Sequence, residues 1–247
     1  MNSIIDKQSI NTIKKTDNNT SIQKQLLLER QIRITIMSLL LAALLFTTVF
    51  GTLENPFQYT FSKIGNRFNH RILFIVWAIF TGGTIEISVI SLFILEKYTV
   101  KLAYYFVAFG SIFLVVSAIV PSLEEIYPLW TWIHVIAASL FALFLSLGIA
   151  PFIIHVSKEN PRLRLVIKIW SLIVWIGSIS WMFILGNTGI FELWFFGSVI
   201  IFLLYLSLIL FEEKIIKQSI FLLKGEKDLD QGIEKIFIKN NKTNKKS

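Results

Sequence analysis

Six long apolar runs dominate this chain and leave it few ways to fold. They cover residues 34–52, 72–95, 102–120, 129–154, 163–185 and 189–211. The hydrocarbon core of a bilayer is about 30 Å thick, which takes about 20 helical residues, so each run is long enough to cross it. The runs are continuous rather than alternating, and backbone in lipid must satisfy its own hydrogen bonds, so we expect helices and not strands. The sequence therefore predicts an all-α, polytopic transmembrane bundle of six helices.

The composition agrees with contact to the lipid bilayer and narrows the chemistry. Hydrophobic residues make up 54% of the 247 and charged residues only 16%, whereas soluble domains carry roughly a quarter charged residues. Cysteine is absent, which excludes disulfides, thiolate metal sites and a cysteine nucleophile. The net charge of +8 lies in the tails and in alternate loops rather than among aromatic residues. We therefore expect no nucleic-acid partner.

Lysine and arginine predict the orientation in the membrane. They concentrate in residues 1–33, in the second and fourth loops and in residues 214–246. The third and fifth loops carry none, and the first carries only Lys63, Arg67 and Arg71. Because cytoplasmic loops carry the excess of Lys and Arg, this pattern places both termini in the cytoplasm. We expect a multi-pass protein of the cytoplasmic (plasma) membrane of a prokaryote, with no secretory signal peptide.

The predicted organisation has three parts. Residues 1–33 form a polar cytoplasmic tail, residues 34–211 the six-helix transmembrane domain, and residues 212–247 a basic cytoplasmic tail. The last part either contains an amphipathic helix on the inner leaflet or begins as a frayed extension of the last span. In both tails, lysines would attract anionic lipid head groups.

Small residues indicate which helices lie at the centre, because they let backbones approach closely in lipid. They are frequent in the second, third and fourth runs, and the sixth run, "SVIIFLLYLSLIL", is bulkier. We expect the second to fourth helices at the centre and the sixth toward lipid.

Glu86 is the most informative polar residue. It lies about 14 residues, or about 21 Å, below the outer end of the second helix, near the bilayer midplane. A carboxylate there is costly unless it is protonated, paired or hydrated, so it should face the bundle interior. Two interpretations stay open: a ligand-binding or proton-coupled site, or a protonated carboxyl hydrogen-bonded to a neighbouring hydroxyl.

The three histidines do not predict a metal centre. His134 and His155 are 21 residues apart on one expected helix, which separates them by about 30 Å. His70 and His134 both lie on the outer side and could meet, completed by Glu124 or Glu125. We expect no metal and no cofactor, because lone histidines at helix ends more often bind loop carbonyls.

A serine–histidine–acid arrangement can be drawn on the outer face from Ser62, His134 and Glu124 or Glu125. No GxSxG elbow supports it. The chain also has no Walker A loop and no dinucleotide fingerprint. These three residues are weak candidates for catalysis.

Two segments carry a family resemblance. They are "ENPFQYTFSKIGNRFNHRILFIVWAIFTGG", with Asn-Pro and a Ser-x-x-Gly turn before a helix, and "VPSLEEIYPLWTWIHVIAASLFALFLSLGIAP", with Pro, acids and a His before a small-residue helix. Together they resemble the prokaryotic multi-helix membrane proteins grouped as domain of unknown function 998. The resemblance covers about residues 34–211 and implies an integral membrane protein of unknown activity. It supplies no catalytic residue and draws attention only to Ser62, Gly65 and His134.

The two outer loops face each other in this topology and suggest a polar mouth. Residues that could line it are Asn55, Ser62, Asn66, His70, Glu124, Glu125 and His134. Arg67 and Arg71 would instead make loop–loop ion pairs with the two acids, each worth about 0–1 kcal/mol at a surface.

Three functions remain open from the sequence. We favour non-enzymatic binding or passage of a small or lipid-like ligand, with Glu86, His134, Ser62, Asn66 and His70 as ligand-binding candidates. The first alternative is a membrane-embedded hydrolase at the outer leaflet. The second is an assembly, sensory or immunity-type partner whose helices bind other helices.

Overall fold

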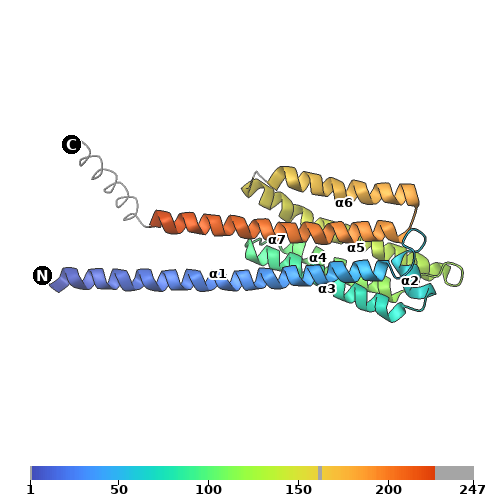
Figure 1. Cartoon of the computed structure of the whole chain (residues 1–247), viewed down its shortest axis with the longest axis horizontal. Coiled ribbons are helices and arrows are strands. Elements are labelled where there is room, and N and C mark those ends of the chain that lie inside the picture. The colour runs from blue at the N-terminus through green and yellow to red at the C-terminus, as the bar shows by residue number, and fades with distance from the viewer. Residues whose placement is uncertain (1, 161–162, 226–247) are drawn as a thin grey trace, which may run out of the picture. The chain divides into compact units, whose positions relative to one another are not determined.

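A computed structural model describes residues 2–160 and 163–225. Those residues form seven helices and no strand: α1 (Asn2–Gly51), α2 (Phe61–Arg67), α3 (Arg71–Leu95), α4 (Lys101–Ile119), α5 (Pro128–Glu159), α6 (Leu163–Leu185) and α7 (Gly189–Gly225) (Figure 1). In this part of the chain, six helices are long and apolar enough to cross a membrane. The predicted all-α, multi-pass architecture is confirmed.

The helix ends follow the sequence closely between residues 71 and 189. The helices α3, α4 and α5 begin one residue before the predicted positions, and α6 matches at both ends. At the termini the helices run on: α1 begins at Asn2 and α7 continues to Gly225. Residues 212–225 extend the last helix, which is one of the two interpretations of the C-terminal tail. Residues 226–247 lie outside the described residues.

Clustering of contacts divides the chain into two compact units, residues 1–205 and residues 206–247. In the second unit, the described residues 206–225 continue α7. The first unit contains α1 to α6 and the first part of α7.

One end of the bundle gathers three connections, and we call it the α2 end. It carries residues 52–70, 120–127 and 186–188, with α2 lying across it (Figure 1). The backbone N–H of Ile190 donates to the carbonyl of Pro56 at 3.0 Å. The Arg71 guanidinium donates to the carbonyl of Ile119 at 2.7 Å. These bonds join the starts of α3 and α7 to segments distant in the sequence.

The helix α2 was not predicted, because seven residues are too few to show a periodic pattern. Its start is capped by Thr60, whose hydroxyl oxygen accepts a hydrogen bond from the backbone N–H of Lys63 at 3.2 Å. Its inner side buries Phe61, Ser62 and Ile64. The segment between the first two spans is therefore a folded cap on the bundle.

The most extensive helix packing joins α4 and α5. A Cβ atom on Gly148 would lie 2.6 Å from Val107 Cγ2 and 3.1 Å from the carbonyl oxygen of Ala103. The helix α3 packs on α4, where the Ser111 hydroxyl donates to the carbonyl of Gly82 at 3.3 Å. The three helices pack through small residues as expected, but they do not form the centre alone, because the described span of α7 is more buried than any of them.

The prediction that the last helix faces lipid was wrong. In the first half of α7, Phe195, Phe196 and Ile200 are buried. The exposed helix is α6, which lies at one edge beside α7 in Figure 1 and leaves Phe183 85% exposed. Small residues are one way to place a helix at the centre, because they let backbones approach closely. Large aromatic side chains are another, because they fill the space between helices that lie farther apart, and α7 is buried in this second way.

An ion pair joins α1 to the far end of α3. Arg33 Nη2 lies 2.7 Å from Glu96 Oε1, and the two side chains are 2% and 19% exposed. Arg33 was predicted to lie in the polar tail. In the structure it is buried in the bundle, where the carboxylate of Glu96, directly after α3, pairs with it.

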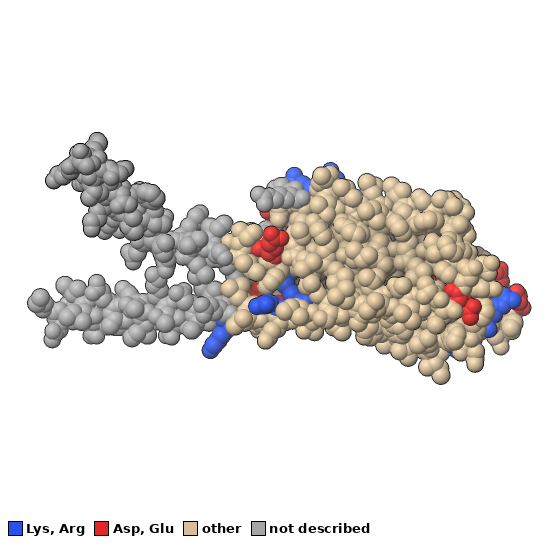
Figure 2. Space-filling model, viewed as in Figure 1, with Lys and Arg blue, Asp and Glu red and all other residues tan. Residues whose placement is uncertain are grey.

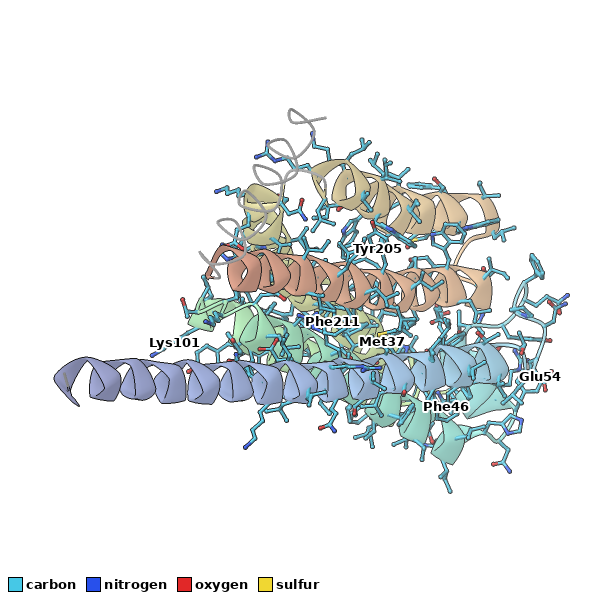
Figure 3. All side chains as sticks on the ribbon, turned by 60° about the vertical axis from the view of Figure 1, so that its left-hand side comes forward. Met37, Phe46, Glu54, Lys101, Tyr205 and Phe211 are labelled. Carbon is cyan, nitrogen blue, oxygen red and sulfur yellow. The ribbon has the colours of Figure 1, made fainter. Side chains whose placement is uncertain are left out.

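Charged side chains otherwise follow the expected distribution. On the face shown in Figure 2, they gather toward the two ends, and a broad band between them carries none. Glu54 and Lys101, labelled in Figure 3, lie toward these opposite ends of the bundle. This band is the surface that would contact the hydrocarbon core of a bilayer.

Candidate functional site

A cavity of about 220 Å³ lies beneath α2, and we call it the carboxylate cavity. The helices α2, α3, α4, α5, α6 and α7 all contribute to its wall. Most of its lining is aromatic or aliphatic, and its polar side chains are Ser117, His134, Ser178 and Glu192. Here the described structure brings the ionisable groups His134 and Glu192 to one partly open space.

Glu192 enters this cavity from the first turn of α7. Its carboxylate accepts a hydrogen bond from the backbone N–H of Phe61, the first residue of α2. The N–H groups of a first helical turn have no partner within the helix, so a carboxylate there satisfies one of them. Glu192 thus attaches the cap to α7 with one oxygen, and no described residue donates a hydrogen bond to its second oxygen.

His134 reaches the cavity from α5 and is 7% exposed. Its Nδ1 lies 2.6 Å from the carbonyl oxygen of Ser117 on α4. A carbonyl oxygen can only accept, so Nδ1 carries the proton and the ring orientation is held by α4. The His134 ring is therefore oriented by a backbone carbonyl and not by an acidic side chain.

Ser178 of α6 adds a hydroxyl to the same cavity. It is 4% exposed, and its Oγ has no hydrogen-bond partner. A buried hydroxyl without a partner costs about 1–3 kcal/mol. A hydrogen bond to a bound molecule would remove this cost at Ser178.

Aromatic side chains form the other walls. Trp77 is fixed by its Nε1, which donates to Thr47 Oγ1 at 3.0 Å. Phe61 and Phe196 both meet Trp77 edge to face, with ring centroids 4.9 Å away in each case. Phe141 stacks on Phe196 at 5.6 Å. The wall is rigid because each ring is held by its neighbours.

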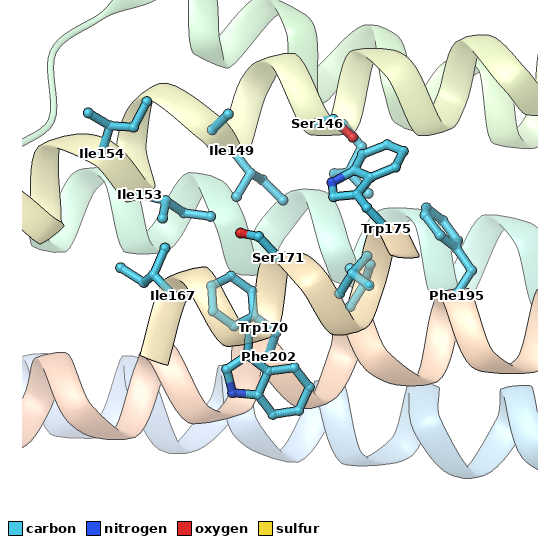
Figure 4. Close-up of a pocket in the computed structure, with 14 residues that line it drawn as sticks. Ser146, Ile149, Ile153, Ile154, Ile167, Trp170, Ser171, Trp175, Phe195 and Phe202 are labelled. Carbon is cyan, nitrogen blue, oxygen red and sulfur yellow. The ribbon is translucent and has the colours of Figure 1, made fainter. Parts of the chain in front are cut away.

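A second cavity of about 270 Å³ continues under α6, and we call it the apolar cavity. It is bounded by α5, α6 and α7, and Figure 4 shows Ile149, Ser171 and Phe202 around the same space. Trp175 and Phe195 line both cavities. The two spaces are therefore adjacent, and the apolar one carries no charged side chain in its lining.

Three predicted site residues lie in or beside α2. Ser62 is buried, and its hydroxyl is paired with that of Thr60 at 3.0 Å. Asn66 donates to the Ser62 carbonyl at 2.8 Å and accepts from Arg71 at 3.2 Å. His70 is half-buried just before α3 and makes no side-chain cap bond. Asn66 thus stabilises the cap, and none of the three lines the carboxylate cavity.

The predicted serine–histidine–acid arrangement is not assembled. Ser62 and His134 bond Thr60 and the Ser117 carbonyl, respectively. Glu124 and Glu125 are exposed in the loop before α5. Arg67 and Arg71 form no ion pair with them among the described residues, so the alternative of loop–loop ion pairs is not realised there. Arg71 binds Asn66 and a carbonyl instead, because the acidic loop stays in solvent.

The described residues contain no group of three or more His, Asp or Glu side chains placed to hold a metal ion. His134 is the only one of the three histidines that lines either cavity. His155 pairs with Glu159 one turn further along α5, at 3.4 Å.

Glu86 is half-buried in α3 and lines neither cavity. No described residue makes a hydrogen bond or ion pair with it, and its neighbour Ile87 is 53% exposed. The structure therefore separates Glu86 from His134, although the sequence suggested that both belong to one site.

Glu192 is the residue that sequence reasoning missed. It is the one acid in the apolar run 189–211, just as Glu86 is the one acid in the run 72–95. It lies three residues inside the predicted span and was not among the predicted site residues. The signal that identifies Glu192 is the same as for Glu86: a single acid within an apolar run, which marks a candidate functional site.

Comparisons with protein-family models, curated proteins and solved structures find no match to this chain. The resemblance to domain of unknown function 998 stays a prediction.

Proposed function

We propose that this protein binds an amphiphilic, lipid-like small molecule without chemically changing it. The polar part of the ligand occupies the carboxylate cavity, and its apolar part contacts the aromatic and aliphatic wall. Ligand sites are typically concave, mostly apolar and equipped with a few convergent polar groups. The carboxylate cavity has this composition.

One observation carries the proposal: Glu192, His134 and the unpartnered Ser178 converge on a space that is otherwise apolar. They come from three different helices, so the convergence is a property of the fold and not of one sequence segment. Binding without reaction is favoured because the only nucleophile suggested by the sequence, Ser62, is bonded to Thr60 and does not line this cavity.

The test is equilibrium binding by the full-length protein in lipid nanodiscs. The probes are radiolabelled dodecyl amphiphiles with alcohol, carboxylate and trimethylammonium head groups. Ala142 lines the carboxylate cavity on α5, and Ala142→Trp would fill it with an indole. Leu143 is 50% exposed and lines neither cavity, so Leu143→Trp is the matched control.

We expect saturable binding of at least one probe, abolished by Ala142→Trp and retained by Leu143→Trp. Thermal melting of both variants checks that they are folded. The proposal is overturned if no probe binds saturably, or if both variants bind like the unmodified protein.

We also propose that both termini face the cytoplasm of a prokaryotic cell, with the α2 end outward. The support is the excess of Lys and Arg in residues 1–33 and after residue 213. The same lysines would attract anionic lipid head groups at the inner surface. A reporter fused after Ser247 should behave as cytoplasmic, and periplasmic behaviour would overturn this orientation.

A further inference from the structure

We propose that the ligand has an ammonium head group held by Glu192 and one alkyl chain that continues into the apolar cavity. This inference rests on the proposed function and names the chemical class of its ligand. It is carried by the charges around Glu192, by the aromatic wall and by the position of the second cavity.

The first argument is electrostatic. No described Lys, Arg or His forms an ion pair with Glu192, and the exposed Lys63 on α2 is the one described cation that attracts its carboxylate electrostatically. A carboxylate in an apolar, membrane-embedded space is costly unless it is protonated, hydrated or paired. A cationic ligand supplies the missing partner, whereas an anionic ligand would meet a like charge.

The second argument concerns the wall around that carboxylate. Phe61, Phe74, Trp77, Phe141 and Phe196 all line the cavity. Aromatic rings attract cations within about 6 Å of the ring centre, and clusters of such rings are a recurrent means of recognising quaternary ammonium groups. A carboxylate within an aromatic enclosure suits an ammonium ion better than an alcohol, which gains little from the rings.

The third argument concerns the chain of the ligand. The apolar cavity begins at Trp175 and Phe195, which it shares with the carboxylate cavity, and extends to Ile154 and Ile167. From Ser178 to Ile167 is 11 residues of α6, or about 16 Å along its axis. Ligand pockets usually measure about 300–1,000 Å³, and cavities of about 220 and 270 Å³ reach that range only together. A head group alone would leave the second cavity empty.

The experiment compares ligands that differ in one feature at a time. Full-length protein in phosphatidylglycerol nanodiscs, whose lipid has no ammonium group, is titrated with dodecyltrimethylammonium, dodecanol, dodecanoate and tetramethylammonium. We expect dodecyltrimethylammonium to bind roughly tenfold or more tightly than the other three, the scale expected from one desolvated charge contact. Tetramethylammonium distinguishes a free ammonium ion from an amphiphile because it lacks the chain.

Variants then assign the two contacts. Glu192→Gln keeps an oxygen to accept from Phe61 N–H and removes the charge. We expect it to abolish the preference for ammonium over alcohol. Glu86→Gln removes a carboxylate that lines neither cavity and should leave the preference unchanged, which also controls for nonspecific attraction of cations to the anionic bilayer.

Ala150→Trp tests the chain. Ala150 lines the apolar cavity, and the neighbouring Leu147, 43% exposed, does not. Ala150→Trp should weaken binding of dodecyltrimethylammonium and leave binding of hexyltrimethylammonium unchanged, and Leu147→Trp should change neither.

The outcomes separate this inference from the proposed function. If dodecanol or dodecanoate binds in an Ala142-dependent manner as tightly as the ammonium probe, the ammonium assignment fails and the binding function stands. If tetramethylammonium binds as tightly as the dodecyl compound, the chain assignment fails. If no probe binds saturably, both proposals fail. Should Glu192→Gln not fold, the ligand series on the unmodified protein still decides.

Discussion

Two sides of this bundle are both mostly apolar and pack in opposite ways. On the closed side, α3, α4 and α5 meet at small residues, and a Cβ atom on Gly110 would lie 3.2 Å from the backbone nitrogen of Leu145. On the open side, α6 leaves two cavities against α5 and α7. Trp194 of α7 packs against α6 there: its Nε1 donates to the Ile173 carbonyl at 3.1 Å, and its indole occupies the space next to Gly177.

The difference lies in the size of the contacting side chains. Association in lipid depends on van der Waals packing, because lipid is as apolar as the protein surface. Glycine and serine allow continuous contact, but indole and phenyl rings hold helices apart and leave gaps between them. We infer that the closed side provides stability and the open side provides the binding space.

The largest effect should come from the buried ion pair at the far end of the closed side. Glu96→Gln removes the carboxylate that lies 2.7 Å from the guanidinium of Arg33, a side chain that is 2% exposed. Removing one partner of a buried pair costs about 3–5 kcal/mol. Unfolding in SDS should show a loss of this order, with ligand binding retained in the folded fraction. Glu86→Gln is the control, and equal stability of the two variants would refute the assignment.

Gly148→Ala should break the closest contact between α4 and α5. The added methyl would meet Val107 Cγ2 at 2.6 Å, and such overpacking costs about 1–3 kcal/mol. At Gly83, an added Cβ meets nothing within 4 Å, so Gly83→Ala should be neutral or stabilise by up to about 1 kcal/mol. Thermal melting compares the two, and loss of stability in both would contradict this account.

Trp194→Phe should loosen the open side alone. It removes the hydrogen bond to Ile173, worth about 1 kcal/mol. Amide hydrogen exchange should rise in α6 and stay constant in α4 and α5. Trp181→Phe is the control. The ring centroids of Trp181 and Trp194 lie 6.1 Å apart, and Trp181 donates no hydrogen bond among the described residues. A uniform rise over all helices would show that α6 is not an independently held element.

The smallest effect concerns Ser178. Because its buried hydroxyl has no partner, Ser178→Ala should leave the stability of the free protein unchanged or raise it by about 1 kcal/mol. The affinity for the ammonium amphiphile should fall a few-fold if the hydroxyl binds the ligand. Ser180→Ala, at an exposed position of α6, should change neither quantity. A stability loss in Ser178→Ala would indicate a purely structural role.

The helices were predictable because their signal is local and strong. Membrane spans need about 20 apolar residues, and the predicted start of α6 at Leu163 and its end at Leu185 were both correct. The cap formed by α2 was not predictable, because it depends on Glu192, which lies 131 residues from Phe61 in the sequence. Contacts of that range leave no periodic pattern.

The site was partly predictable. His134 was identified from its position before a small-residue helix, and it lines the carboxylate cavity. Glu86 and Glu192 are both single acids in apolar runs, and hydropathy cannot tell which of them faces a cavity. That choice depends on how far each helix is rotated about its axis, which is set by packing against its neighbours.

The most direct test locates the ligand chain. Dodecyltrimethylammonium with a diazirine at the end of its chain is bound to the full-length protein, irradiated, and mapped by mass spectrometry. We predict labelling of residues 149–154 of α5 and 167–171 of α6, reduced strongly by Glu192→Gln and retained in Glu86→Gln. Labelling spread over lipid-facing positions such as Ile79 and Ile87 of α3, unchanged by Glu192→Gln, would contradict the account.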